Sequence, residues 1–184
     1  VDMMKILSKD PDHDFRLLVA GAGPQAEWLQ KQSDKRAPDK IIQLGHLDKD
    51  LLAGFYANAD VFVHPNPREP FGIAPLEAMA SGIPTLAPNA GGILSYATNE
   101  NAWLVEPNGE DFAAAVREIV GDDELRAQKV ANALATALEN TRERSTDRLL
   151  ETYDKIYEDF QSRNELFTDI AAAKSFDYIP LTDA

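Results

Sequence analysis

The sequence predicts an α/β fold, an open and mostly parallel sheet with helices flanking its strands. Segments with apolar residues at helical spacing separate five short apolar runs, and these intervals suit right-handed βαβ crossovers. The chain of 184 residues, 44% of them hydrophobic, is long enough to bury one core. The five runs typical of buried strands are 15–23, 41–45, 60–65, 83–88 and 102–107.

The helices between these strands are indicated one by one. The first run ends in glycines, and helix-forming residues follow it. Residues 48–59 place apolar side chains at helical spacing behind Asp48, which we expect to cap this helix. The third strand leads through a loop into a helix from about 73 to 81, with Gly82 as its C-terminal cap.

After the last strand the pattern becomes helical. Segments 109–120 and 122–141 have acidic starts and apolar residues at helical spacing, and the helix at 142–163 carries one apolar stripe. We therefore divide the chain into an α/β domain at 1–141, this long helix, and a tail at 164–184 that shows no clear period.

Composition excludes several classes of protein. A net charge of −13 argues against nucleic-acid binding, and the absence of cysteine excludes disulfides and thiolate sites. No apolar run is long enough to span a bilayer, and no signal peptide is visible. No histidine cluster has metal-ligand spacing, so we expect no protein-bound metal. These features predict a cytoplasmic location.

The stretch REPFGIAPLEAMASGIP, residues 68–84, carries the functional signal. The backbone amides of Gly72, Ile73 and Ala74 fall at the predicted helix start, where they lack intrahelical partners. Such an end attracts anions, phosphate above all, and Gly72 lets a ligand approach the backbone closely. The carboxyl end of a parallel strand is also where α/β sheets bind ligands.

Two carboxylates flank this helix start. Glu77 has the chemistry to accept hydrogen bonds from a ribose diol, and Glu69 faces the region beyond the phosphates. On spacing alone, a second interpretation is favoured, in which Glu77 complements the helix dipole and Glu69 is a solvated loop charge. His64 is interpreted as a hydrogen-bonded wall residue of the same region.

The stretch resembles the Glu-(x)7-Glu signature of retaining GT-B glycosyltransferases of the large group-1, glycogen-synthase-like family. Glu69 and Glu77 are separated by seven residues, and PFG follows the first glutamate directly. Further segments match in family order, and the resemblance covers about residues 1 to 160, the C-terminal, donor-binding half of that fold. The matching segments are LLVAGAGP, IIQLGHL, FYANADVFVHPNPREPFGIAPLEAMASGIPTLA, NAGGI and NAWLVEPNGEDFAAAV.

The resemblance implies roles for individual residues. It implies that Glu69, the catalytic position, contacts the donor sugar near the reacting phosphate and that Glu77 binds the nucleotide ribose. It also implies a nucleotide-diphosphate sugar as substrate, with no cofactor and no metal. It further implies that the diphosphate or sugar is contacted by backbone groups at Phe71, Gly72, Ile73 and Ala74. By the same resemblance, the nucleotide is contacted by Leu47, Gly21 and Gly23. For Gly21 and Gly23, a tight strand-to-helix turn explains the glycines equally well.

Departures from the family pattern also matter. The family's domain opens with a strand that carries an Arg and a Lys, which neutralise the diphosphate leaving group. We expect this strand, and the N-terminal acceptor domain that precedes it in the family, to lie outside the sequence. The fragment is then expected to bind a nucleotide and yet be inactive alone. The full-length protein has scope for peripheral membrane contact, without a transmembrane segment.

Two other functions stay open at this point. One is a sugar-nucleotide epimerase, which shares the two-domain architecture. The other is a non-catalytic nucleotide-binding or interaction module that uses the apolar stripe of the long helix. The sequence leaves the base and sugar of the donor, the acceptor and the oligomeric state undefined.

Overall fold

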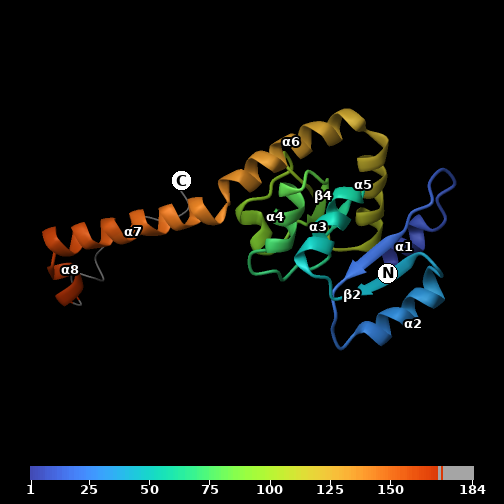
Figure 1. The fold of residues 1–184 in the computed structure, drawn as a ribbon, viewed down its shortest axis with the longest axis horizontal. Helices are drawn as coiled ribbons and strands as arrows, with labels where there is room; N and C mark the ends of the chain where they lie inside the picture. The colour runs from blue at the N-terminus through green and yellow to red at the C-terminus, as the bar shows by residue number, and fades with distance from the viewer. Residues whose placement is uncertain (170, 172–184) are drawn as a thin grey trace. The chain divides into compact units, whose positions relative to one another are not determined.

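The computed structural model describes residues 1–169 and residue 171 (Figure 1). Val1–Glu139 forms one compact unit, and a second unit begins at Asn140. We describe each unit by itself. The candidate site lies entirely in the first.

All five predicted strands are present, each no longer than the apolar run that predicted it. The predicted cap at Asp48 is confirmed, because its side chain accepts a hydrogen bond from the Leu51 amide at 2.8 Å. The helix α1 had not been assigned from periodicity. The elements of the first unit are α1 (Asp2–Leu7), β1 (Leu17–Ala20), α2 (Ala26–Arg36), β2 (Ile41–Gly45), α3 (Lys49–Asn58), β3 (Phe62–Val63), α4 (Ile73–Ala80), β4 (Thr85–Pro88), the 3-10 helix η1 (Gly92–Ser95), β5 (Trp103–Val105), α5 (Gly109–Gly121) and α6 (Asp123–Glu139).

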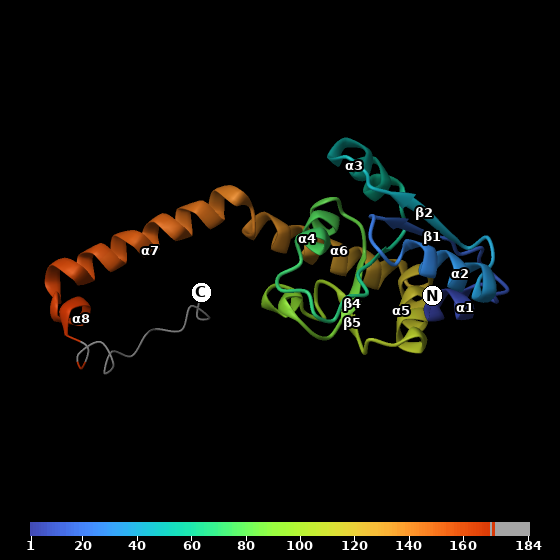
Figure 2. The ribbon, with the colours of Figure 1, turned by 90° about the horizontal axis from the view of Figure 1, so that it is seen from below.

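The strands are all parallel, which confirms the predicted α/β class, but they form two sheets rather than one. β1 pairs with β2 (Figure 2), and a second sheet has the order β3-β4-β5. Among the described strands, no ladder joins β1 to β3, so each of them keeps one unpaired edge. β4, with a partner on each side, is buried along its whole length.

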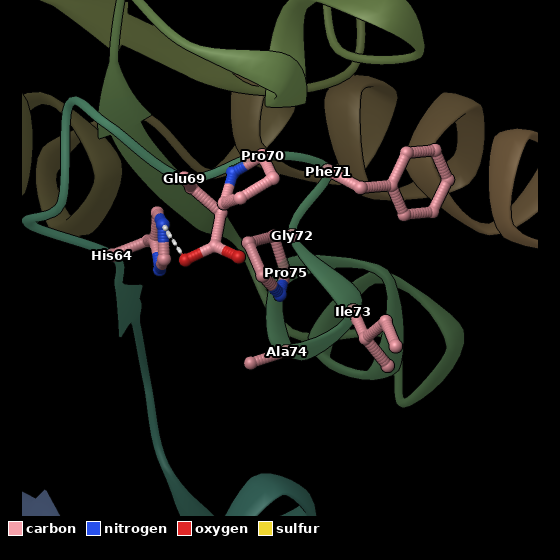
Figure 3. A pocket seen from close by; sticks show the side chains of 8 residues that line it. All are labelled: His64, Glu69, Pro70, Phe71, Gly72, Ile73, Ala74 and Pro75. Carbon is pink, nitrogen blue, oxygen red and sulfur yellow. Dashed lines mark ion pairs between the residues drawn. The ribbon is translucent and has the colours of Figure 1, made fainter.

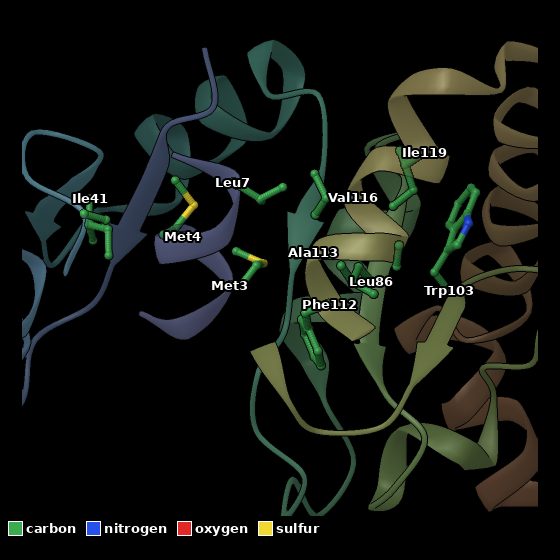
Figure 4. Close-up of a cluster of buried hydrophobic side chains, with 12 residues drawn as sticks. Met3, Met4, Leu7, Ile41, Leu86, Trp103, Phe112, Ala113, Val116 and Ile119 are labelled. Carbon is green, nitrogen blue, oxygen red and sulfur yellow. The ribbon is translucent and has the colours of Figure 1, made fainter. Parts of the chain in front are cut away.

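One hydrophobic cluster spans both sheets. Met3, Met4 and Leu7 on α1 lie between Ile41 of β2 and the side chains of α5 (Figure 4). α1 and α5 therefore hold the two sheets in one core through side-chain packing. Besides Ile41, the α5 and β-strand members of this cluster are Leu86, Trp103, Phe112, Ala113, Ala115, Val116 and Ile119.

A second cluster supports the segments that carry the site. Met79 of α4 and Ile93 of η1 are both fully buried, and they pack with Tyr96 and with Ala133 and Ala137 of α6. α6 therefore lies behind the loop that follows β4 and fixes that loop against α4. Because parallel strands end at the same edge of a sheet, the loops after β3 and β4 meet there.

The second unit contains α7 (Arg142–Ser162) and the short α8 (Glu165–Thr168). The apolar stripe predicted for this helix is exposed, since every member is at least 41% accessible: Leu149, Leu150, Tyr153, Ile156, Tyr157 and Phe160. Of the predicted tail at 164–184, residue 170 and residues 172–184 lie outside the described part. Over the residues that the structure covers, no helix combines the length and apolarity needed to cross a membrane.

Ile119→Ala tests the shared core. Ile119 is fully buried in the cluster that spans both sheets, so its truncation is expected to lower the free energy of unfolding by about 2–5 kcal/mol. Urea denaturation followed by circular dichroism measures this value. The matched control is Ile73→Ala, because Ile73 is 67% exposed in the same unit and should cost less than about 0.5 kcal/mol. Equal losses in both variants would contradict the assigned core.

Candidate functional site

The start of α4 depends on Gly72. This residue caps the helix with a φ of 93°, in the left-handed region that side chains rarely adopt. A Cβ atom at this position would also lie 2.8 Å from the Tyr96 hydroxyl oxygen. Gly72 is thus required both by backbone conformation and by space. As a glycine it gives the helix start no capping side-chain hydrogen bond, so the first amides of α4 are left uncapped.

The loop after β4 holds the loop after β3 in place. The amide of Gly92 donates to the carbonyl of Glu69 at 2.7 Å, and the Tyr96 hydroxyl donates to the carbonyl of Gly72 at 2.5 Å. A Cβ on Gly92 would come within 1.8 Å of the Pro70 carbonyl oxygen, so only glycine permits this approach. Two hydrogen bonds therefore pin both ends of the segment 69–72.

Tyr96 serves this role as a neutral hydroxyl. Its burial, followed by the charge of Glu69, raises the pKa of its phenol well above the usual range. Its ring also packs edge-on against Phe71, with ring centroids 5.3 Å apart.

A cavity of about 310 Å³ lies at this helix start. The Glu69 carboxylate points between the His64 ring and the first turn of α4, whereas the Phe71 ring points away from it (Figure 3). The cavity is lined by His64, Glu69, Pro70, Phe71, Gly72, Ile73, Ala74 and Pro75.

Glu69 is held by its neighbours and still reaches solvent. Its side chain is 29% exposed, and Asn66 Nδ2 donates to its Oε2 at 3.1 Å. His64 Nε2 lies 3.8 Å from the same oxygen. The interpretation of His64 as a hydrogen-bonded wall residue is wrong in one respect, because its buried Nε2 has no hydrogen-bond partner among the described residues.

The structure brings five of the predicted site residues together and leaves the others apart. Glu69, Phe71, Gly72, Ile73 and Ala74 all line the cavity.

Glu77 lies on α4 and is exposed, but it is not among the lining residues. The charge of Glu77 acts on Tyr56 of α3, whose phenol pKa is raised by burial first and by Glu77 second. Its assignment to a ribose stays a prediction.

Gly21, Gly23 and Leu47 belong to the other sheet. Gly21 follows β1 directly, and its amide donates to the carbonyl of Gly45 at the end of β2, at 2.7 Å. Leu47 lies two residues beyond the end of β2. These three residues therefore share the carboxyl edge of the β1–β2 sheet, outside the cavity at α4, and their assigned contacts also remain predictions.

Sequence reasoning missed two supports of the site. Tyr96 and Asn66 fix the segment that carries Glu69, and neither was singled out. Asn66 lies three residues before Glu69 between two prolines, a spacing that suits a side chain folding back on its own loop. Tyr96 carries no such local signal, because its contact with Gly72 spans 24 residues.

Comparison with known proteins extends the description. The family model for glycosyl transferases group 1 matches residues 1–136. A GDP-mannose-dependent alpha-mannosyltransferase from Corynebacterium glutamicum is 36% identical over 143 residues, which cover 76% of this chain and 33% of that protein. The chain spans about a third of the length of these curated relatives.

Solved structures agree with this match. The C-terminal domain of a glycosyl transferase group 1 family protein (LpcC) from Francisella tularensis aligns with a TM-score of 0.64 at 26% identity, over 76% of each chain. HepE from Anabaena in complex with UDP has a TM-score of 0.71 at 22% identity, over 84% of this chain and 44% of its own, and supports the fold alone. With the family model matching well over half of its length, this chain belongs to the group 1 glycosyl transferases.

Proposed function

We propose that this chain is the donor-binding part of a retaining glycosyltransferase, which moves a sugar from a nucleotide-diphosphate donor to a hydroxyl acceptor. The observation that carries the proposal is the cavity at the start of α4. There a carboxylate, Glu69, lies beside backbone amides that no side chain caps. A helix start of this kind favours a diphosphate, and a carboxylate next to it is placed to accept hydrogen bonds from sugar hydroxyls.

The proposed donor runs from the cavity outward. Backbone groups at Gly72, Ile73 and Ala74 hold the diphosphate, and Glu69 contacts the transferred sugar. Glu77 lies about one turn further along α4, where its exposed carboxylate accepts from the ribose diol. The base then rests against the turn near Leu47.

The names of the relatives support a nucleotide sugar but differ in the base. The mannosyltransferase from C. glutamicum is named as GDP-mannose-dependent, and HepE was solved with UDP. Both nucleotides therefore belong in the test.

The division of the strands supports the further proposal that a first strand precedes Val1 in the full-length protein. In the doubly wound order 3-2-1-4-5-6, the first strand lies between the second and the fourth. Numbered in this way, β1 and β3 are the second and fourth strands, and the two sheets separate between them. We propose that this strand brings the Arg and Lys that neutralise the leaving group, and that the chain alone binds donor without transferring sugar.

A nucleotide panel tests the proposal. The 184-residue chain is mixed with UDP, GDP, ADP and their glucose or mannose conjugates, and its melting is followed. At a hundredfold excess over Kd, a bound nucleotide stabilises the fold by about 2.7 kcal/mol. The same shift with Mg²⁺ and with EDTA supports binding without a metal. If no nucleotide changes the melting temperature, the donor-binding role is refuted. Retention is tested separately, by using NMR to identify the anomer that the full-length protein forms.

Glu77→Ala is expected to weaken nucleotide binding about ten- to a hundredfold. A charge-assisted hydrogen bond contributes about 1.5–3 kcal/mol, and each 1.4 kcal/mol corresponds to a factor of ten in affinity. Calorimetry with the best nucleotide of the panel measures the change. Glu124→Ala, an exposed glutamate on α6, is the control and should bind as the parent does. Equal affinity in Glu77→Ala and the parent would refute the ribose contact.

Gly72→Ala is expected to abolish detectable nucleotide binding while the fold survives. Its Cβ would meet the Tyr96 hydroxyl at a backbone φ of 93°, so the start of α4 has to shift. The control is Gly54→Ala, because Gly54 lies inside α3 with open space around it and the change should leave binding intact. Isothermal calorimetry reports affinity, and circular dichroism reports folding. Unchanged binding in Gly72→Ala would count against the helix-start site.

A further inference from the structure

His64 is a constrained residue with one unused polar atom. Its amide donates to the carbonyl of Leu86 at 2.8 Å, which ties the backbone to β4 just beyond the end of β3. Its ring stacks on Phe62, with centroids 6.5 Å apart, and its side chain is only 11% exposed. The ring therefore has little freedom to turn toward solvent.

The unused atom is Nε2. It is buried, and it has no hydrogen-bond partner among the described residues. Buried polar atoms almost always have partners in native proteins, so an orphan of this kind calls for an explanation. The nearest charged group is the Glu69 carboxylate, whose Oε2 lies 3.8 Å away (Figure 3). The Nε2···Oε2 distance is longer than a typical N–H···O hydrogen bond by less than about 1 Å.

Glu69 has the freedom to close that distance. Its backbone is pinned by the Gly92 amide, but its side chain is partly exposed and, among the described residues, accepts one hydrogen bond, from Asn66. A carboxylate oxygen accepts more than one hydrogen bond, so Oε2 can bind Asn66 and His64 together. Because the backbone of Glu69 is pinned, the proposed movement is a rotation of its side chain.

The charges around the ring favour this contact. Burial lowers the pKa of His64, and the negative charge of Glu69 opposes that effect, so a neutral imidazole faces a carboxylate. A neutral ring donates from one nitrogen, and proton placement on Nε2 satisfies both groups. Tyr96 faces Glu69 from the loop after β4, and Tyr56 packs edge-on against Phe62 from α3.

We propose that His64 is a positioning residue for Glu69. Its Nε2–H binds Glu69 Oε2 and fixes the carboxylate in the orientation that receives hydroxyl groups of the donor sugar. The sugar-binding half of this inference rests on the proposed function, whereas the His64–Glu69 contact does not.

The contact is tested without any ligand. Nitrogen-15 NMR of the histidine rings gives the tautomer and the pKa of His64, with His13 and His46 as internal references. The expected result is an Nε2–H tautomer and a pKa that falls in Glu69→Gln, since the raising charge is removed. Glu77→Gln, the matched control, should leave the pKa of His64 unchanged. An Nδ1–H tautomer, or the same pKa in Glu69→Gln and the parent, overturns the proposal.

The positioning role is tested by comparing a nucleotide sugar with its nucleotide. His64→Leu removes the donor, whereas His64→Gln keeps an N–H group at a similar reach. We expect His64→Leu to weaken the binding of UDP-glucose or GDP-mannose about tenfold, and to leave the binding of UDP or GDP within about twofold of the parent. His64→Gln is expected to restore most of the lost affinity for the nucleotide sugar.

The outcomes separate the two ideas. Equal weakening of nucleotide and nucleotide sugar in both variants identifies His64 as a packing residue and overturns the positioning role. If the parent chain binds no nucleotide, the proposed function fails, and the NMR titration alone decides whether the His64–Glu69 contact exists. Melting curves of both variants show that the fold is retained.

Discussion

The candidate site depends on the contact between two loops that end neighbouring parallel strands. The amide of Gly92 and the hydroxyl of Tyr96 donate to the carbonyls at the two ends of the segment 69–72. Without these bonds, the left-handed Gly72 and the uncapped start of α4 would have little to hold them, because the segment is a loop with no ladder of its own. The second hydrophobic cluster, which includes Tyr96 and Ile93, anchors this loop pair to α6.

The sequence predicted the elements well and the arrangement of the sheet less well. Alternating apolar runs and helical spacing are local signals, and they located all five strands and the helix start at Ile73. They also predicted that Glu69 and the amides after Phe71 would meet at one strand end. The division into two sheets depends on which strand edges hydrogen-bond, and no local pattern reports that.

Side-chain partners were the other part that local patterns did not reach. Tyr96 binds a residue 24 positions earlier, and the orphan nitrogen of His64 appears only when the surrounding atoms are known. Both arise from packing between segments that the sequence alone does not bring together. The family resemblance located Glu69 and Glu77 as a pair, yet it could not show that one lines a cavity while the other lies outside it.

The separation of the strands leaves side-chain packing as the joint between the two described sheets. β1 and β2 join the remaining core through side chains of α1 and α5 rather than through a continuous ladder of hydrogen bonds. Leu47 and the glycine turn follow the strands of the β1–β2 pair, and Glu69 follows β3 of the other sheet. A ligand that touched both would add a noncovalent cross-link to that side-chain packing, so its binding and the joint between the sheets would stabilise each other.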